Sequence, residues 1–140
     1  MLSEQIKAIL NERFNKDALM ALATINGDYP SVRTVDAYYE DECFYIITHA
    51  LSNKMKHINH NPHVALSGEW FSAQGVAINL GYFGKDENKK VADKLMKVFY
   101  SWINNGHNNF ADKNTIILCI KLNNGVLFSN GTRYELTFGI

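Results

Sequence analysis

The segment Ala18–Thr48 reads ALMALATINGDYPSVRTVDAYYEDECFYIIT, and it decides the fold of this 140-residue chain. It contains three runs of strand length, which are either continuously apolar or alternate between two faces. Between the first two runs stands Asn26-Gly27-Asp28, and Asn-Gly is one of the strongest signals for a hairpin turn. Glu40-Asp41 supplies a second turn. The segment therefore predicts three consecutive antiparallel strands, at Ala18–Ile25, Ser31–Tyr39 and Cys43–Thr48.

Further strands and three helices are expected around this meander. An amphipathic helix follows the N-cap residue Ser3, a short helix begins at Ser52 and stops before Pro62, and a long helix spans Asp86–Trp102. Six to eight strands with three helices favour a mainly β (β+α) fold, an antiparallel barrel with peripheral helices, as a single domain over residues 1–140. The additional strands are expected at His63–Ser67, Gly75–Leu80, Thr115–Leu122, Gly125–Phe128 and Tyr134–Phe138, with a turn at Asn123-Asn124-Gly125.

The composition excludes several classes of partner. Lysine plus arginine equals aspartate plus glutamate at 14 each, so no excess positive charge selects nucleic acid or an anionic membrane. No stretch approaches the roughly 20 apolar residues of a membrane span, and the N-terminus lacks the features of a signal peptide. Cys43 and Cys119 lie inside apolar runs and are expected to be buried in strands. We expect a cytoplasmic protein without a nucleic-acid or membrane partner.

Motifs of hydrolases, kinases and metalloproteases are absent from the sequence. His57, His60 and His63 are evenly spaced, but Pro62 interrupts the helix between the last two, and no cysteine or carboxylate cluster completes a metal set. We therefore expect no metal site.

The segment Thr48–Lys54 joins the end of a strand to the start of a helix. The amides and partial positive charge of a helix N-terminus suit a phosphate, and Lys54, with the hydroxyls of Thr48 and Ser52, adds donors. Arg33 reaches the same place if the meander pairs as expected, and a guanidinium holds phosphate bidentately. The alternative is a capped helix with a solvated lysine and a surface arginine. The residues alone leave both interpretations open.

Five short strings in order resemble the pyridoxamine 5′-phosphate oxidase-like family of FMN-binding split barrels. They are Leu22-Ala23-Thr24 with Gly27-Asp28-Tyr29-Pro30, then Arg33-Thr34-Val35, Ile47-Thr48, Ser52-Asn53-Lys54, and Asn61-Pro62-His63-Val64-Ala65-Leu66. They cover roughly half the chain. The end of the chain, Gly131-Thr132-Arg133-Tyr134, is also similar to small members of the family.

This resemblance implies a split-barrel homodimer with FMN bound at the interface. Arg33 and Lys54 would hold the FMN phosphate with help from Ser52, while Thr48 would lie by the ribityl phosphate. The backbone of Val35 would meet the flavin ring, and Trp70 would reach the ring or the interface. Arg133 would be a ligand from the other subunit or a surface residue. The expected cofactor-binding residues are Arg33, Thr34, Val35, Thr48, Ser52, Lys54, Trp70 and Arg133.

The chain also departs from the family's namesake enzyme. In that enzyme a lysine follows the arginine motif, whereas the residues directly after the motif here include Asp36, Tyr38 and Tyr39 and no lysine. The enzyme's C-terminal signature, which is rich in Arg, Trp and Pro, is also missing from this sequence. These departures argue against pyridoxal phosphate synthesis. The resemblance instead implies an FMN-dependent oxidoreductase acting on a small-molecule substrate. No catalytic residue is assigned, because the flavin carries the chemistry.

Two other interpretations remain. One is a non-catalytic flavin- or haem-binding or sensing protein of the same fold, with His49 and His107 as the histidines available to a haem iron. The other is a structural dimer that binds no small ligand.

Overall fold

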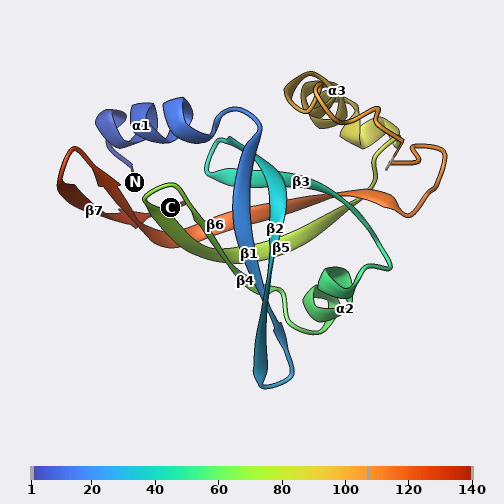
Figure 1. The fold of residues 1–140 in the computed structure, drawn as a ribbon, viewed down its shortest axis with the longest axis horizontal. Coiled ribbons are helices and arrows are strands. Elements are labelled where there is room, and N and C mark those ends of the chain that lie inside the picture. The colour runs from blue at the N-terminus through green and yellow to red at the C-terminus, as the bar shows by residue number, and fades with distance from the viewer. Residues whose placement is uncertain (1, 107, 140) are drawn as a thin grey trace.

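The expected meander forms the first three strands of the computed structural model, which describes residues 2–106 and 108–139. These strands are β1 (Ala18–Asn26), β2 (Tyr29–Glu40) and β3 (Cys43–His49). Asn26 pairs with Tyr29, so Gly27 and Asp28 form a two-residue turn, and Gly27 has the positive φ of 62° that glycine allows; the turn lies within the predicted Asn26-Gly27-Asp28. The β1–β2 hairpin projects beyond the rest of the sheet, at the bottom of Figure 1.

The remaining strands close the sheet into a barrel. They are β4 (His63–Gly68), β5 (Phe71–Tyr82), β6 (Thr115–Ser129) and β7 (Thr132–Thr137). Every pairing is antiparallel, the order is β3-β2-β1-β4-β5-β6-β7, and β3 also pairs with β6. The first six strands of this order thus form a closed barrel, and β7 extends β6 outward. The expected mainly β split barrel with peripheral helices is confirmed.

Three α-helices pack outside the barrel (Figure 1). α1 (Glu4–Phe14) begins where the sequence predicts, because Ser3 Oγ accepts a hydrogen bond from the amide of Ile6. α2 (Asn53–His60) lies against β1, and α3 (Lys89–Val98), preceded by the 3-10 turn η1 (Asp86–Asn88), lies on the other side of β3. Among the described residues, no helix is long and apolar enough to cross a membrane.

Two apolar cores result. The first fills the barrel and reaches α1 and α2, whose Met55 and Ile58 face inward as expected. The second lies between α3 and the outer face of β3 and β6, with Leu95, Phe99 and Ile117 at its centre. Residues 116–120 of β6 are therefore buried on both faces, which explains their continuously apolar run.

The expected turn at Asn123-Asn124-Gly125 is wrong, because β6 continues through it as one strand. A register shift occurs there, between Gln74 and Gly75 of β5. Gly125 allows β5 and β6 to approach each other closely, because a Cβ at this position would lie 2.5 Å from the carbonyl oxygen of Ser72. The turn comes later, at Asn130 and Gly131, both of which have positive φ.

The helix expected over Asp86–Trp102 is shorter than predicted, since α3 ends at Val98. Tyr100, Ser101 and Trp102 are weaker helix formers than the lysines, Leu95 and Met96 that precede them. Trp102 is instead held by a tertiary contact, in which its Nε1 donates to Asp17 Oδ2 at 2.9 Å. β5 is longer at both ends than the expected Gly75–Leu80.

Candidate functional site

One end of the barrel is polar. The strand alternation that points Met20 and Leu22 into the core also points Thr24 inward, and Arg33 lies on the same face of β2 as the buried Val35. Thr48 follows the inward-facing Phe44 and Ile46 on β3. α2 packs against β1 here and contributes Lys54 and His57. Side chains from four elements thus meet where the apolar core ends.

The guanidinium of Arg33 is held along one edge. Its Nη1 donates to Thr24 Oγ1 at 2.7 Å and to the carbonyl of Leu22 at 3.1 Å, while Nη2 donates to Ser31 Oγ at 3.0 Å. A guanidinium has five N–H groups, and the Nε hydrogen and the second Nη2 hydrogen lie together on the other edge. These two have no partner among the residues that the structure describes. Arg33 therefore presents a fork that suits bidentate binding of an oxyanion.

Lys54 lies beside this arginine. Its Nζ donates to Thr48 Oγ1 at 2.8 Å, which ties the first turn of α2 to the end of β3. Burial and, after it, the charge of Arg33 lower the pKa of Lys54. Burial likewise lowers the pKa of Arg33. The two cations are thus held near each other at a cost to both charged forms.

No carboxylate offsets these charges within the described ranges 2–106 and 108–139. The ion pairs of the molecule involve other residues, and neither Arg33 nor Lys54 takes part in one. Partly buried like charges without a counterion are destabilising unless an anion joins them.

Ser52 adds a hydroxyl without a partner. It occupies the N-cap position of α2, as expected, but its side chain makes no capping bond, and its Oγ is buried without any hydrogen-bond partner in the described chain. The first amides of α2 lack helical acceptors by geometry. A buried hydroxyl, free helix amides and two cations form a donor set without an acceptor, which fits a phosphate monoester.

Two members of this cluster, Thr24 and His57, are absent from the sequence-based site. Thr24 is only 1% exposed, and its Oγ1 accepts from Arg33 and lies 2.8 Å from Nδ1 of His57. Signals for both exist in the sequence. Thr24 lies two residues from Leu22, the partner of Arg33 in the hairpin, and His57 follows Lys54 by about one helical turn.

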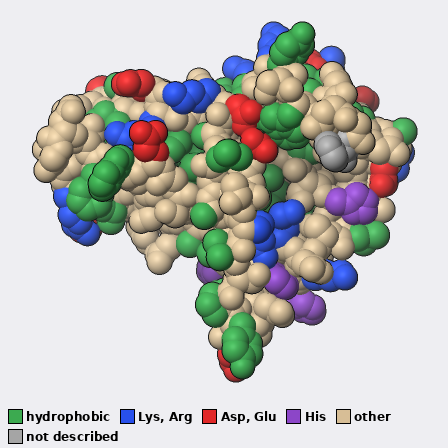
Figure 2. All heavy atoms as spheres, viewed as in Figure 1, with side chains coloured by type: hydrophobic (Ala, Val, Ile, Leu, Met, Phe, Trp, Pro, Cys, Tyr) green, Lys and Arg blue, Asp and Glu red, His purple; other side chains and the backbone are tan. Residues whose placement is uncertain are grey.

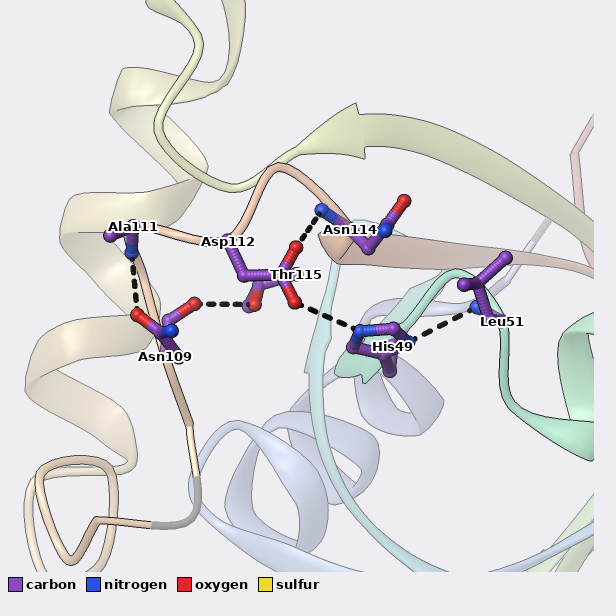
Figure 3. Close-up of polar contacts among 7 residues, drawn as sticks. All are labelled: His49, Leu51, Asn109, Ala111, Asp112, Asn114 and Thr115. Carbon is purple, nitrogen blue, oxygen red and sulfur yellow. Dashed lines mark hydrogen bonds and ion pairs between the residues drawn. The ribbon is translucent and has the colours of Figure 1, made fainter.

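His49 links the segment between β3 and α2 to the loop that precedes β6 (Figure 3). His49 Nε2 lies 3.0 Å from Asp112 Oδ2, and its Nδ1 accepts from the amide of Leu51 at 3.2 Å. The amide of Ala50 also donates to the carbonyl of Asn114 at 2.7 Å. Both ring nitrogens of His49 are engaged, so it is not a free ligand for a haem iron. His107, the other histidine considered, lies outside the described residues.

Figure 2 shows this region from outside. Lys and Arg side chains gather in the middle of the face, with His side chains beside them at the position of α2 in Figure 1.

The other expected site residues lie elsewhere. Thr34 is exposed on the opposite face of β2 from Arg33, and the side chain of Val35 is buried in the barrel. Trp70 is 71% exposed in the β4–β5 turn, which Arg13 of α1 holds through the carbonyl of Glu69. Arg133 on β7 pairs with Glu135. β7 and the β4–β5 turn lie across the molecule from α2 (Figure 1), so one chain does not bring Trp70 or Arg133 to Arg33.

The outer face of the sheet carries a shallow cavity of about 510 Å³. Small side chains line much of it, including Ala23, Ala65 and Ser72, with Val32 at its border. A neighbouring cavity of about 300 Å³ reaches Thr24. Neither is lined by Arg33 or Lys54, which are both half-buried. No group of three His, Cys, Asp or Glu side chains that suits a metal occurs in the part of the chain that the structure describes.

Comparison with known proteins adds a family and a fold. A family model described as pyridoxamine 5′-phosphate oxidase matches residues 2–124. No curated protein matches the sequence. Among solved structures, general stress protein 26 from Bacillus anthracis strain Sterne is similar with a TM-score of 0.68 and 18% identity, over 94% of this chain and 99% of that chain.

Two further structures are similar at low identity. One is an FAD-binding protein from Mesorhizobium loti, with a TM-score of 0.68 and 15% identity over 89% of this chain and 92% of that one. The other is a heme binding protein from Mycobacterium smegmatis, with a TM-score of 0.63 and 12% identity over 87% of this chain and 53% of that one. At such identities these likenesses show the shared barrel.

Proposed function

This chain belongs to the pyridoxamine 5′-phosphate oxidase family, and on that premise we propose that it is an FMN-binding oxidoreductase. The cofactor phosphate is held by Arg33, Ser52 and Lys54, with Thr48 orienting the lysine. A small molecule is the substrate. The expected cytoplasmic location stays a prediction.

The observation that carries this proposal is the cation pair without a counterion. The fork of Arg33 and the ammonium of Lys54 face no carboxylate among the described residues, and the Oγ of Ser52 is buried without a partner. A dianionic phosphate monoester satisfies all three groups at once. FMN and the other phosphate-bearing flavins contain such a group or a diester, whereas riboflavin has none.

The chain's residues bind and orient the cofactor in this proposal. Thr48 accepts from Lys54 and sets the position of its charge, and Ser31 and Leu22 hold the arginine from behind. The backbone of β2 from Arg33 to Val35 leads away from the phosphate and offers its amides and carbonyls to the polar edge of the ring. When bound, the flavin supplies hydride or electron transfer, and no acid or base of the protein is required for it.

A homodimer is part of the proposal. Leu19 and Val32 are 69% and 68% exposed on the outer face that also carries the 510 Å³ cavity, and exposed apolar surface of this kind suits a partner. A second copy seated there would cover this exposed apolar surface. Within one chain, Trp70 and Arg133 lie far from Arg33. In the dimer they would instead reach the cofactor site of the partner.

A non-catalytic flavin- or haem-binding protein remains the second candidate, favoured by the likeness to a heme binding protein. Haem would need an axial ligand, and His49 has both nitrogens engaged. The cluster of Arg33, Ser52 and Lys54, which suits a phosphate, favours flavin over haem.

The absorption spectrum of the purified protein, followed by chromatography of the ligand released on denaturation, tests the proposal. We expect two flavin bands and released FMN, with loss of colour in Arg33→Ala and Lys54→Ala but not in Lys56→Ala, an exposed lysine of the same helix. Bleaching of the flavin bands by a nicotinamide donor would support turnover. A haem band, or a colourless protein whose melting temperature ignores added FMN, would overturn the proposal.

A further inference from the structure

His57 continues the hydrogen-bond network of Arg33 away from the anion-binding edge. Thr24 Oγ1 stands between them, 2.7 Å from Arg33 Nη1 and 2.8 Å from His57 Nδ1. Thr24 is almost fully buried, and His57 comes from α2, the helix that also carries Lys54. The network therefore links the helix of one cation to the strand of the other.

The direction of these bonds follows from the chemistry of the groups. A guanidinium only donates, so Thr24 Oγ1 must accept from Arg33. The hydroxyl has one hydrogen of its own, and within the described residues its remaining partner is Nδ1 of His57. In the arrangement that satisfies every group, Thr24 donates to an unprotonated Nδ1, and His57 fixes the rotation of the hydroxyl.

We propose that His57 is a positioning residue for the phosphate-binding arginine. By orienting the hydroxyl of Thr24, it holds Nη1 of Arg33 on the protein side and leaves the Nε and Nη2 edge turned toward the anion. This inference rests on the proposed binding of FMN through its phosphate. It adds a role for two residues that do not touch the ligand.

The other contacts of Arg33 do not make His57 redundant. The carbonyl of Leu22 and the side chain of Ser31 also accept from the guanidinium, at 3.1 and 3.0 Å, but the bond to Thr24 is the shortest of the set. Without an acceptor at position 57, the Thr24 hydroxyl is free to rotate and to offer its hydrogen to other groups. The guanidinium then loses one of the contacts that define its plane.

The test compares FMN with riboflavin, which has the same ring and no phosphate. Dissociation constants for both are measured by flavin fluorescence in the wild-type protein, His57→Leu, His57→Asn, Thr24→Val and the double variant His57→Leu/Thr24→Val. His60→Leu, an exposed histidine of the same helix, is the matched control. Asparagine keeps an acceptor near the place of Nδ1 and serves as the conservative replacement.

We expect the preference for FMN over riboflavin to fall roughly 5- to 10-fold in His57→Leu and in Thr24→Val, the effect of one lost buried hydrogen bond. The double variant should fall no further, because both changes break the same network. His57→Asn should restore most of the preference, and His60→Leu should keep it.

The outcomes separate this inference from the proposed function. A wild-type protein without preference for FMN would refute phosphate binding itself. A clear wild-type preference that survives in both His57→Leu and Thr24→Val would overturn the positioning role alone. If His57→Leu weakens FMN and riboflavin equally, His57 acts only through general packing, and the inference is likewise wrong.

Discussion

Lys54 on α2 lies within electrostatic reach of Arg33 on β2, since burial and then the charge of Arg33 lower the pKa of the Lys54 ammonium. The two residues are 21 positions apart in the sequence and come together because the β1–β2–β3 meander brings the start of α2 back to the hairpin. No carboxylate of residues 2–106 and 108–139 forms an ion pair with either cation, so the two side chains together suit an anion.

The flavin-free protein holds the charges of Lys54 and Arg33 close together without a bound anion. Lys54→Met removes one of two neighbouring charges and keeps an apolar stem of similar length, so the flavin-free protein should melt higher, by roughly 2–4 °C for about 1 kcal/mol. Saturating FMN should raise the melting temperature of the wild type but hardly that of the variant. Differential scanning calorimetry with and without FMN measures both. A variant that melts lower without flavin would show that the wild-type charges are already balanced.

Asp36 makes the stability of the fold depend on pH. Burial, followed by a hydrogen bond with Asp17 and its charge, raises the pKa of Asp36 to about 6 from an ordinary value of 3.8. Asp17 also accepts from Trp102, while its Oδ1 is buried without another partner among the described residues. A proton on Asp36 therefore stabilises this carboxylate pair.

The sign follows from proton binding. Between about pH 4 and pH 6 the folded chain holds the proton of Asp36 and the unfolded chain does not, so the free energy of unfolding falls as the pH rises through this window. Asp36→Asn should flatten the dependence and stabilise the protein at pH 7.5 by roughly 1 kcal/mol after solvent screening of this partly exposed pair is allowed for, or roughly 2–4 °C. Glu87→Gln, exposed at η1, is the control. Parallel melting profiles for Asp36→Asn and the wild type from pH 4.5 to 7.5 would contradict this account.

The proposed dimer should depend on the apolar outer face at Val32. Val32→Glu places a charge on the exposed outer face and should convert a dimer into a folded monomer, with weaker FMN binding because Trp70 and Arg133 of the partner are then lost from the site. Tyr100→Glu, at an 80% exposed position on the α3 side, should stay dimeric and bind FMN. Sedimentation equilibrium measures the mass of each. A dimeric Val32→Glu protein would place the interface elsewhere.

Much of this architecture is predictable from the sequence because its signals are local. Alternation in Ser31–Tyr39 and the Asn26-Gly27 turn predict the meander, and the meander predicts that Arg33 and Lys54 approach each other. The residue types of Asn123-Asn124-Gly125 are also typical of a turn, but in the structure Gly125 is needed for close packing of β6 against Ser72. The contact between Thr24 and His57 could not be predicted from the sequence, because it depends on the strand register and on the rotation of α2 about its axis, which no single segment encodes.

Gly125 provides a test of the corrected strand. In Gly125→Val the new Cβ would meet the carbonyl oxygen of Ser72 at 2.5 Å and the Cβ of Ala73 at 2.9 Å. The overpacking should lower the free energy of unfolding by roughly 2–4 kcal/mol, as measured by urea denaturation. Asn124→Ala, at the exposed neighbouring position, should cost under about 1 kcal/mol. Equal stabilities of Gly125→Val and the wild type would favour an open turn over a continuous strand.

The most direct test of the central claim is a pair of equilibrium titrations of the flavin-free wild-type protein, one with FMN and one with riboflavin. The two ligands share the ring and differ in the phosphate, so the ratio of their dissociation constants isolates the contribution of Arg33, Ser52 and Lys54. Two charge-assisted contacts predict that FMN binds at least about 30-fold more tightly. Equal dissociation constants would contradict the assignment of this cluster as a phosphate site.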